Sequence, residues 1–153
     1  MTQNQPYELL LRQLESILSM ETDPVANMAN TAAVLFNNLA DLNWAGFYVL
    51  RADELVLGPF QGKPACVRIA LGRGVCGTAA QTGQTQRVQN VHEFKGHIAC
   101  DSASQSEIVI PIFKQGRVWG VLDIDSPVLS RFTQEDQIFL ERVVGLFAQK
   151  TSL

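Results

Sequence analysis

The sequence predicts an α+β domain in which two helices precede an antiparallel sheet and a third long helix follows it. Three observations lead to this prediction. Apolar residues recur at helical spacing over residues 7 to 40 and again after Thr133. Between those segments, short aromatic and β-branched runs alternate with turn residues. Helices, then strands, then a helix is an order that favours helices packed on an antiparallel sheet over a parallel α/β arrangement.

The first helix is expected over residues 7 to 19, where apolar side chains repeat every three or four residues. Asp23 is expected to cap the second helix, which runs to about Ala40. Pro24 then occupies the first helical position, where its missing N–H does no harm. Two helices therefore come before any strand.

The first strands are predicted as a hairpin, Trp44 to Leu50 and Leu55 to Leu57. The two glycines and two prolines of Gly58 to Pro64 indicate a loop, which leads to a short strand at Val67 to Leu71. These residues form one side of the predicted sheet.

A short helix is expected at Val75 to Gln81, with Gly83 as its stop and a strand at Gln86 to Val88 after it. The glycines at the start of this helix suggest a phosphate-binding turn. However, they lack the Lys-Ser/Thr of a P-loop and the spacing of a dinucleotide fingerprint. A plain tight turn is favoured.

The last hairpin pairs Ile108 to Phe113 with Arg117 to Asp125, and the closing helix runs to about Gln149 with a Thr133–Asp136 cap. A three-residue loop would place Phe113 opposite Arg117 and Glu107 opposite Asp123. One apolar face would then hold Ile108, Ile110, Ile112, Val118, Leu122 and Ile124. The other would hold Glu107, Val109, Phe113, Trp119, Val121, Asp123 and Asp125.

Three carboxylates, those of Glu107, Asp123 and Asp125, would therefore converge at one end of an otherwise apolar face. A frayed strand end in water would explain Asp123 and Asp125 equally well. In a partly desolvated pocket, the like charges would raise one another's pKa, so that one carboxyl group could hold a proton near neutral pH.

The composition excludes several classes of protein. The chain has 153 residues and a formal charge of -3, and its twelve basic residues are scattered, which argues against nucleic-acid binding. No apolar run is long enough to cross a membrane, and the first residues do not form a secretory signal. We expect one domain over residues 1–153, in the cytoplasm.

The three cysteines leave three interpretations open, because an odd number in a reducing compartment does not suit a disulfide framework. They could be inert thiols, a zinc site that combines Cys66, Cys76 and Cys100 with His92 and His97, or a redox pair. No C-x-x-C pair supports zinc, so no metal is expected.

Cys100 is the thiol best suited to chemistry, because it lies in a long polar stretch, Asn90 to Ser106, with His97 and Asp101 beside it. Cysteines that serve only in packing usually have apolar neighbours. Loops of this length are usually functional or disordered.

Several motifs together resemble the free methionine-R-sulfoxide reductases, which are GAF-domain enzymes. The resemblance runs from about Trp44 to the final helix. The motifs are Trp44-Ala-Gly-Phe-Tyr48, Gly62-Lys-Pro-Ala-Cys66-Val-Arg-Ile, Gly72-Arg-Gly-Val-Cys76-Gly-Thr, Asn90-Val-His, His97-Ile-Ala-Cys100-Asp-Ser-Ala-Ser, Ser106-Glu107-Ile-Val-Ile-Pro and Gly120-Val-Leu-Asp123-Ile-Asp125-Ser.

The resemblance implies a GAF-like fold, with the N- and C-terminal helices on one face of the sheet and a ligand pocket on the other. It implies that Cys100 is the nucleophile and Cys66 the likeliest of the resolving thiols. Cys76 is an alternative resolving thiol, whose pKa the start of the short helix could lower.

The same resemblance implies that Glu107, Asp123 and Asp125 bind the substrate and protonate the departing oxygen, and that Trp44 and Tyr48 form the substrate-binding wall. The implied substrate is free methionine R-sulfoxide, with no bound cofactor and with thioredoxin as the external reductant.

Two rival functions and the oligomeric state stay open. A GAF domain can bind a small molecule or sense oxidants without turnover, because a fold does not fix a function. A zinc-stabilised interaction module would bind stoichiometric metal and unfold on chelation. The sequence does not determine the oligomeric state, and it is compatible with a homodimer.

Overall fold

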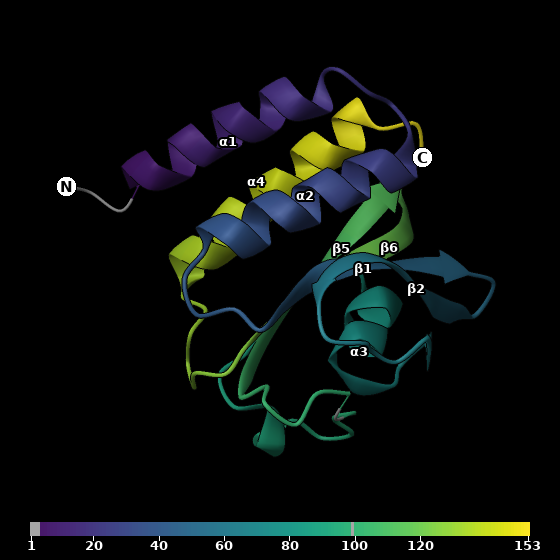
Figure 1. The fold of residues 1–153 in the computed structure, drawn as a ribbon. Helices are drawn as coiled ribbons and strands as arrows, with labels where there is room; N and C mark the ends of the chain where they lie inside the picture. The colour runs from purple at the N-terminus through teal and green to yellow at the C-terminus, as the bar shows by residue number, and fades with distance from the viewer. Residues whose placement is uncertain (1–3, 99) are drawn as a thin grey trace.

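The computed structural model describes residues 4–98 and 100–153, which form a six-stranded antiparallel sheet with helices on both faces (Figure 1). Ala99, inside the predicted polar stretch, lies outside the described residues, as do residues 1–3. The strand order is β3-β2-β1-β6-β5-β4. The strands are β1 (Trp44–Arg51), β2 (Glu54–Gly62), β3 (Arg68–Ala70), β4 (Gln86–Val88), β5 (Ser106–Lys114) and β6 (Arg117–Ser126). The predicted α+β class is confirmed.

The helices divide between the two faces of the sheet. In Figure 1, α1, α2 and α4 lie together on one side and α3 on the other. Each side has its own apolar core, and Ile108 and Val109 belong to different ones. None of the described helices is long and apolar enough to cross a membrane. Their bounds are α1 (Asn4–Leu18), α2 (Pro24–Asn38), α3 (Gly74–Thr82) and α4 (Gln134–Lys150), with a 3-10 turn, η1, at Val91–Glu93.

The helix ends follow the predicted caps. The Asp23 carboxylate accepts the Ala26 N–H at 3.0 Å, which satisfies a free donor of the first turn of α2. Thr133 and Asp136 form a reciprocal capping box at α4. Gly83 ends α3 with a left-handed φ of 67°, a conformation that costs glycine little.

Strand β2 is longer than predicted, because it continues to Gly62 through residues that were expected to form a loop. A bulge opposite Phe47 accommodates Gly58 and Pro59, since the pairing shifts between Gly46 and Tyr48. Strand β3 pairs only with the beginning of β2, so the missing N–H of Pro59 interrupts no ladder on that side.

The β5–β6 register also differs from the prediction. The turn has two residues, Gln115 and Gly116, both with positive φ, so Lys114 pairs with Arg117. A bulge between Ile112 and Phe113 then adds a second shift. The predicted pair of Glu107 with Asp123 is therefore wrong.

The two-residue periodicity of strands explains why most side chains of β5 and β6 lie on the predicted face of the sheet although the register differs. The shorter turn and the bulge each shift the pairing by one residue, and a total shift of two restores the original face. Glu107 thus pairs with Asp125, on the same side as Asp123. Between turn and bulge the faces are exchanged, so Trp119 packs on Phe147 and Val118 lies on the α3 side, opposite to the prediction.

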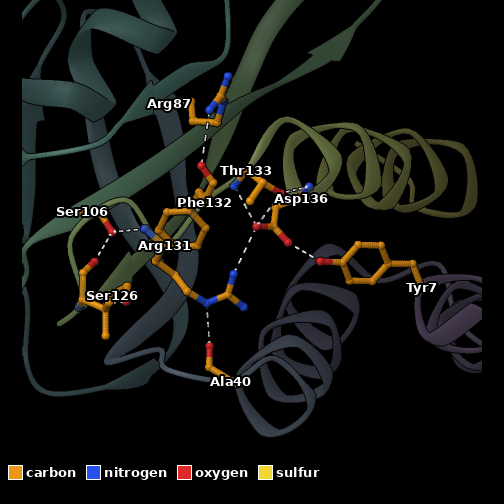
Figure 2. Close-up of polar contacts among 10 residues, drawn as sticks. Tyr7, Ala40, Arg87, Ser106, Ser126, Arg131, Phe132, Thr133 and Asp136 are labelled. Carbon is orange, nitrogen blue, oxygen red and sulfur yellow. Dashed lines mark hydrogen bonds and ion pairs between the residues drawn. The ribbon is translucent and has the colours of Figure 1, made fainter. Parts of the chain in front are cut away.

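A partly buried polar network joins the first helix, the last helix and the sheet (Figure 2). Asp136 accepts hydrogen bonds from the Tyr7 hydroxyl, from Thr133 and from Arg131, and the Arg131 Nε also donates to the Ala40 carbonyl at 2.9 Å. Burial and the Asp136 carboxylate raise the pKa of Tyr7, so its hydroxyl keeps the proton that it donates.

The same segment holds the start of β5. Ser106 is fully buried, and its hydroxyl donates to the Val128 carbonyl at 2.6 Å and accepts the Arg131 N–H at 3.3 Å (Figure 2). The position of Glu107, the next residue, is therefore fixed by the connection between β6 and α4.

We predict that Asp136→Ala lowers the free energy of unfolding by about 3 kcal/mol, because it removes half of the α4 capping box and leaves the partly buried Arg131 without its ion pair. Urea unfolding measures this change. Glu141→Ala, on the exposed side of α4, is the control and should cost less than about 0.5 kcal/mol. Equal losses in the two variants would contradict the assigned role of the network.

Candidate active site

A pocket opens on the face of the sheet that carries α3, opposite α1, α2 and α4. Strands β1, β5 and β6, the start of α3 and the connection between β4 and β5 all contribute to its wall. Most of the predicted site residues line it, namely Trp44, Tyr48, Cys76, Cys100, Glu107, Asp123 and Asp125.

Cys66 and Cys100 form a disulfide beside this pocket, with their Cα atoms 5.6 Å apart. That distance is typical of disulfides. The two residues are 34 positions apart in sequence, and the segment between them contains β3, α3 and β4. The fold therefore brings a thiol from the head of β3 to the polar stretch that carries Cys100.

The three carboxyl groups meet at the floor of the pocket, from β5 and β6. Glu107 is 7 % exposed and Asp123 is 5 % exposed. Burial raises the pKa of Glu107 and of Asp125 well above the ordinary carboxyl range, and the neighbouring carboxylates raise both further. Burial also raises the pKa of Asp123. Such a cluster retains a proton where isolated carboxyl groups would be ionised.

In this cluster the buried Oδ1 of Asp123 has no partner among the fixed donors of the protein. The donors near the Asp123 carboxylate are the titratable groups themselves, those of Glu107, Asp125 and Cys76. A buried acceptor without a partner costs free energy, and a donor on a bound molecule would recover it. The floor of the pocket is thus able to accept hydrogen bonds from a ligand.

Cys76 lies in the first turn of α3, buried against the same carboxyl groups. Burial raises the pKa of its thiol well above the ordinary value, and the Asp123, Glu107 and Asp125 charges raise it further. The expectation that the helix start would lower this pKa is therefore wrong. Desolvation and three like charges outweigh the helix dipole.

Aromatic rings form one wall of the pocket. Trp44 stacks on Phe60 with 5.2 Å between ring centroids, and its indole N–H donates to the Lys63 carbonyl. The Tyr48 hydroxyl donates to the Cys66 carbonyl at 2.8 Å. Gly46 permits this packing, because a Cβ there would lie 2.8 Å from the Trp44 ring.

The sequence did not indicate Asn43, which joins the Cys100 connection to the sheet. Its side-chain amide donates to Asp101 Oδ2 and to Ser104 Oγ, both at 3.0 Å. Asp101 Oδ1 accepts the Ala103 N–H at 2.9 Å and so forms an Asx turn. The Asp-Ser-Ala-Ser run after Cys100 signals such a turn, but nothing local identifies its partner.

Among the described residues, one group of three side chains lies close enough together to share a metal ion. Its donors, from Cys76, Glu107 and Asp123, lie within 4.8 Å of one another. This group differs from the zinc set that the sequence suggested, since Cys66 and Cys100 are joined to each other and the two histidines are not in the group. The group contains two of the predicted substrate-binding acids.

Comparison with known proteins places this chain in a family. The model of the GAF domain matches residues 13–150. A free methionine-R-sulfoxide reductase of Escherichia coli is 54 % identical over 145 residues, which are 95 % of this chain and 88 % of the relative. A protein of the same name from Saccharomyces cerevisiae is 46 % identical over 91 % of this chain and 82 % of its own.

A solved structure supports the same relationship. The fRMsr of Staphylococcus aureus, in complex with substrate, superposes with a TM-score of 0.90 at 50 % sequence identity. The match covers 94 % of each chain. The similarity therefore includes the sheet and the helices on both of its faces.

We predict that the pKa of the Cys76 thiol in the oxidised protein lies well above that of an ordinary cysteine, because burial and three carboxyl groups disfavour its thiolate. In this form Cys76 is the single free thiol, so the rise in ultraviolet absorbance with pH, after subtraction of that of a Cys76→Ser variant, reports on its thiolate. Asp123→Asn should lower the pKa by removing one of the charges.

Asp53→Asn, in the exposed turn between β1 and β2, is the matched control and should leave the titration unchanged. A Cys76 pKa at or below the ordinary thiol value of about 8.5 would contradict the electrostatic description of the pocket.

Proposed function

The chain belongs to the GAF domain family and, within it, to the free methionine-R-sulfoxide reductases, and from this we propose that it reduces free methionine R-sulfoxide to methionine by thiol chemistry. The observation that carries the proposal is the Cys66–Cys100 disulfide beside a pocket floored by three carboxyl groups, two of them buried. A nucleophile, a second thiol and a proton donor are the groups that this reaction requires.

Cys100 is the proposed nucleophile. Its thiolate attacks the sulfur of the protonated sulfoxide and forms an S–S bond. The oxygen then passes from the substrate sulfur to the Cys100 sulfur as the S–S bond breaks, so methionine leaves with two more electrons and Cys100 becomes a sulfenic acid. The pocket lining includes Cys100 but not Cys66, which supports this assignment of the two thiols. Cys66 is bonded to Cys100 in the disulfide, which supports its role as the thiol that reaches the product of the first step.

The acids have two proposed roles. The sulfoxide oxygen is a poor leaving group until it is protonated, and the raised pKa of Glu107 keeps a proton available near Cys100. Asp123 and Asp125 accept hydrogen bonds from the substrate's ammonium group, a role that suits the unpartnered Asp123 Oδ1. Because a peptide-bound methionine has no free ammonium group, this contact favours the free amino acid.

Trp44 and Tyr48 are proposed to hold the methyl group of the sulfoxide. Both are 2 % exposed and both line the pocket, so their rings offer a fixed apolar surface. Hydrogen bonds from both side chains to the Lys63–Cys66 segment restrict the rings further. A fixed wall on one side of the sulfur distinguishes the R from the S configuration.

The cycle closes through the two cysteines. The Cys66 thiol condenses with the Cys100 sulfenic acid to give the disulfide and water, and thioredoxin reduces the disulfide by thiol exchange. No bound cofactor is required. This cycle needs a reducing compartment, which supports a cytoplasmic location. Cys76, held as a neutral thiol, remains a less favourable alternative to Cys66.

Turnover of different substrates tests the proposal. NADPH oxidation coupled through thioredoxin reductase and thioredoxin should occur with free methionine R-sulfoxide. It should be at least about tenfold slower with the free S-sulfoxide or with an R-sulfoxide inside a peptide. Absence of R-specific turnover would refute the proposed reductase activity. Binding of the sulfoxide without turnover would indicate the rival function, that of a GAF sensor.

The cysteine variants separate the two chemical steps. Cys100→Ser should abolish methionine formation with the fold intact, because the nucleophile is lost. Cys66→Ser should form about one methionine per protein and then stall, because the sulfenic acid lacks its resolving thiol. Methionine is quantified after mixing the reduced protein with substrate. Continued turnover of Cys66→Ser would indicate resolution by Cys76 or direct reduction of Cys100.

A further inference from the structure

The connection that carries Cys100 runs from the end of β4 to the start of β5. In the described part of the chain, the side-chain hydrogen bonds that join this connection to the rest of the protein come from Asn43. The disulfide is the covalent tie, and the Phe94 and Ile98 side chains pack on the apolar core of the α3 side. The Asn43 hydrogen bonds involve neither sulfur, so reduction of the disulfide removes no atom that they need.

Asn43 is itself fixed to the sheet beside the site. It directly precedes β1, and its backbone N–H donates to the carbonyl of Asp125 at 3.0 Å. Its side-chain amide then spans to Asp101, the residue after Cys100, and to the buried Ser104. Asn43 thus connects Asp101 and Ser104, which follow the nucleophile in sequence, to β6, the strand that carries Asp123 and Asp125.

The Asn43–Asp101 hydrogen bond joins an amide to an ionised carboxylate. The Ala103 N–H lowers the pKa of Asp101, and the Asn43 amide and the Lys63 charge lower it further, so the group is charged at neutral pH. Hydrogen bonds to charged groups are among the stronger ones in proteins. Loss of this bond would let the connection sample positions in which Cys100 is farther from Cys66.

We propose that Asn43 is a positioning residue for disulfide formation, an inference that rests on the proposed function. In that step the Cys66 sulfur attacks the sulfur of the Cys100 sulfenic acid. The S–S bond forms, the S–O bond breaks, and the oxygen leaves as water with the Cys66 proton. Asn43 touches neither sulfur in this description; it holds Asp101, and through it Cys100, within reach of Cys66.

The test follows the two steps separately in one turnover of the reduced protein. Methionine formed reports the first step, and loss of free thiols together with trapping of sulfenic acid by dimedone reports the second. Asn43→Ala should form methionine at nearly the wild-type rate. Its disulfide should form about tenfold more slowly, the effect expected for one hydrogen bond to a charged group, and more sulfenic acid should be trapped.

Two further variants keep the test independent of any one substitution. Asp101→Ala removes the acceptor instead of the donor and should behave in the same way. Asn38→Ala, an exposed asparagine on α2 whose amide donates only to its own helix, is the matched control and should behave as wild type. Thermal unfolding of each variant reports on the fold.

A reversed pair supplies the rescue. Asn43→Asp alone should slow disulfide formation, because two carboxylates then face each other. The double variant Asn43→Asp with Asp101→Asn restores an amide–carboxylate hydrogen bond with the donor on the other side, and should recover most of the rate. If Asn43 only stabilised the fold, the reversed pair would not specifically recover the rate of disulfide formation.

The outcomes separate the two proposals. If wild type forms no methionine, the proposed function fails. If wild type forms methionine and Asn43→Ala forms its disulfide at the wild-type rate, the positioning role of Asn43 is refuted. Equal slowing of both steps in Asn43→Ala, without recovery in the reversed pair, would likewise refute it.

Discussion

The antiparallel pairing of β5 with β6 fixes which side chains face the pocket, because successive residues of a strand point to opposite sides of the sheet. Strand β6 lies between β1 and β5, with an apolar core on each face. Glu107, Asp123 and Asp125 therefore share the side that carries Val109 and Val121, where few water molecules can solvate a charge. Their raised pKa values, and with them the capacity to hold a proton near the thiols, follow from this ladder.

The elements that local sequence determines could be predicted, and those that depend on distant partners could not. Asp23, Gly83 and the Thr133–Asp136 pair mark helix ends through contacts within a few residues, so the helices agree with the prediction. The β5–β6 register was wrong, since a bulge is selected by packing across the whole sheet. The acids nevertheless fell on one face because only the parity of the shift matters. Asn43 was missed because its partners lie about sixty residues away.

The three cysteines are chemically alike in sequence but differ in environment. Cys76 is buried against the carboxyl groups, and this setting stabilises the neutral thiol. Cys66 and Cys100 are only partly buried, and they lie on segments that the fold brings into contact. Their pairing was implied by family resemblance alone, since no spacing rule selects one partner from three thiols. The extent to which the fold buries each thiol, more than its local sequence, distinguishes the inert thiol from the redox pair.

The disulfide also closes a covalent ring that contains β3, α3 and β4. A cross-link over a segment of this length restricts the unfolded chain by about 3 to 4 kcal/mol in the chain-entropy description. Thermodynamic stability therefore changes with the redox state of a single bond. In the proposed cycle the reduced form accepts the substrate. Because this form lacks the cross-link, we expect the segment between Cys66 and Cys100 to open to proteases more readily in it. Supply of oxidised substrate would thus affect the lifetime of the protein as well as its turnover.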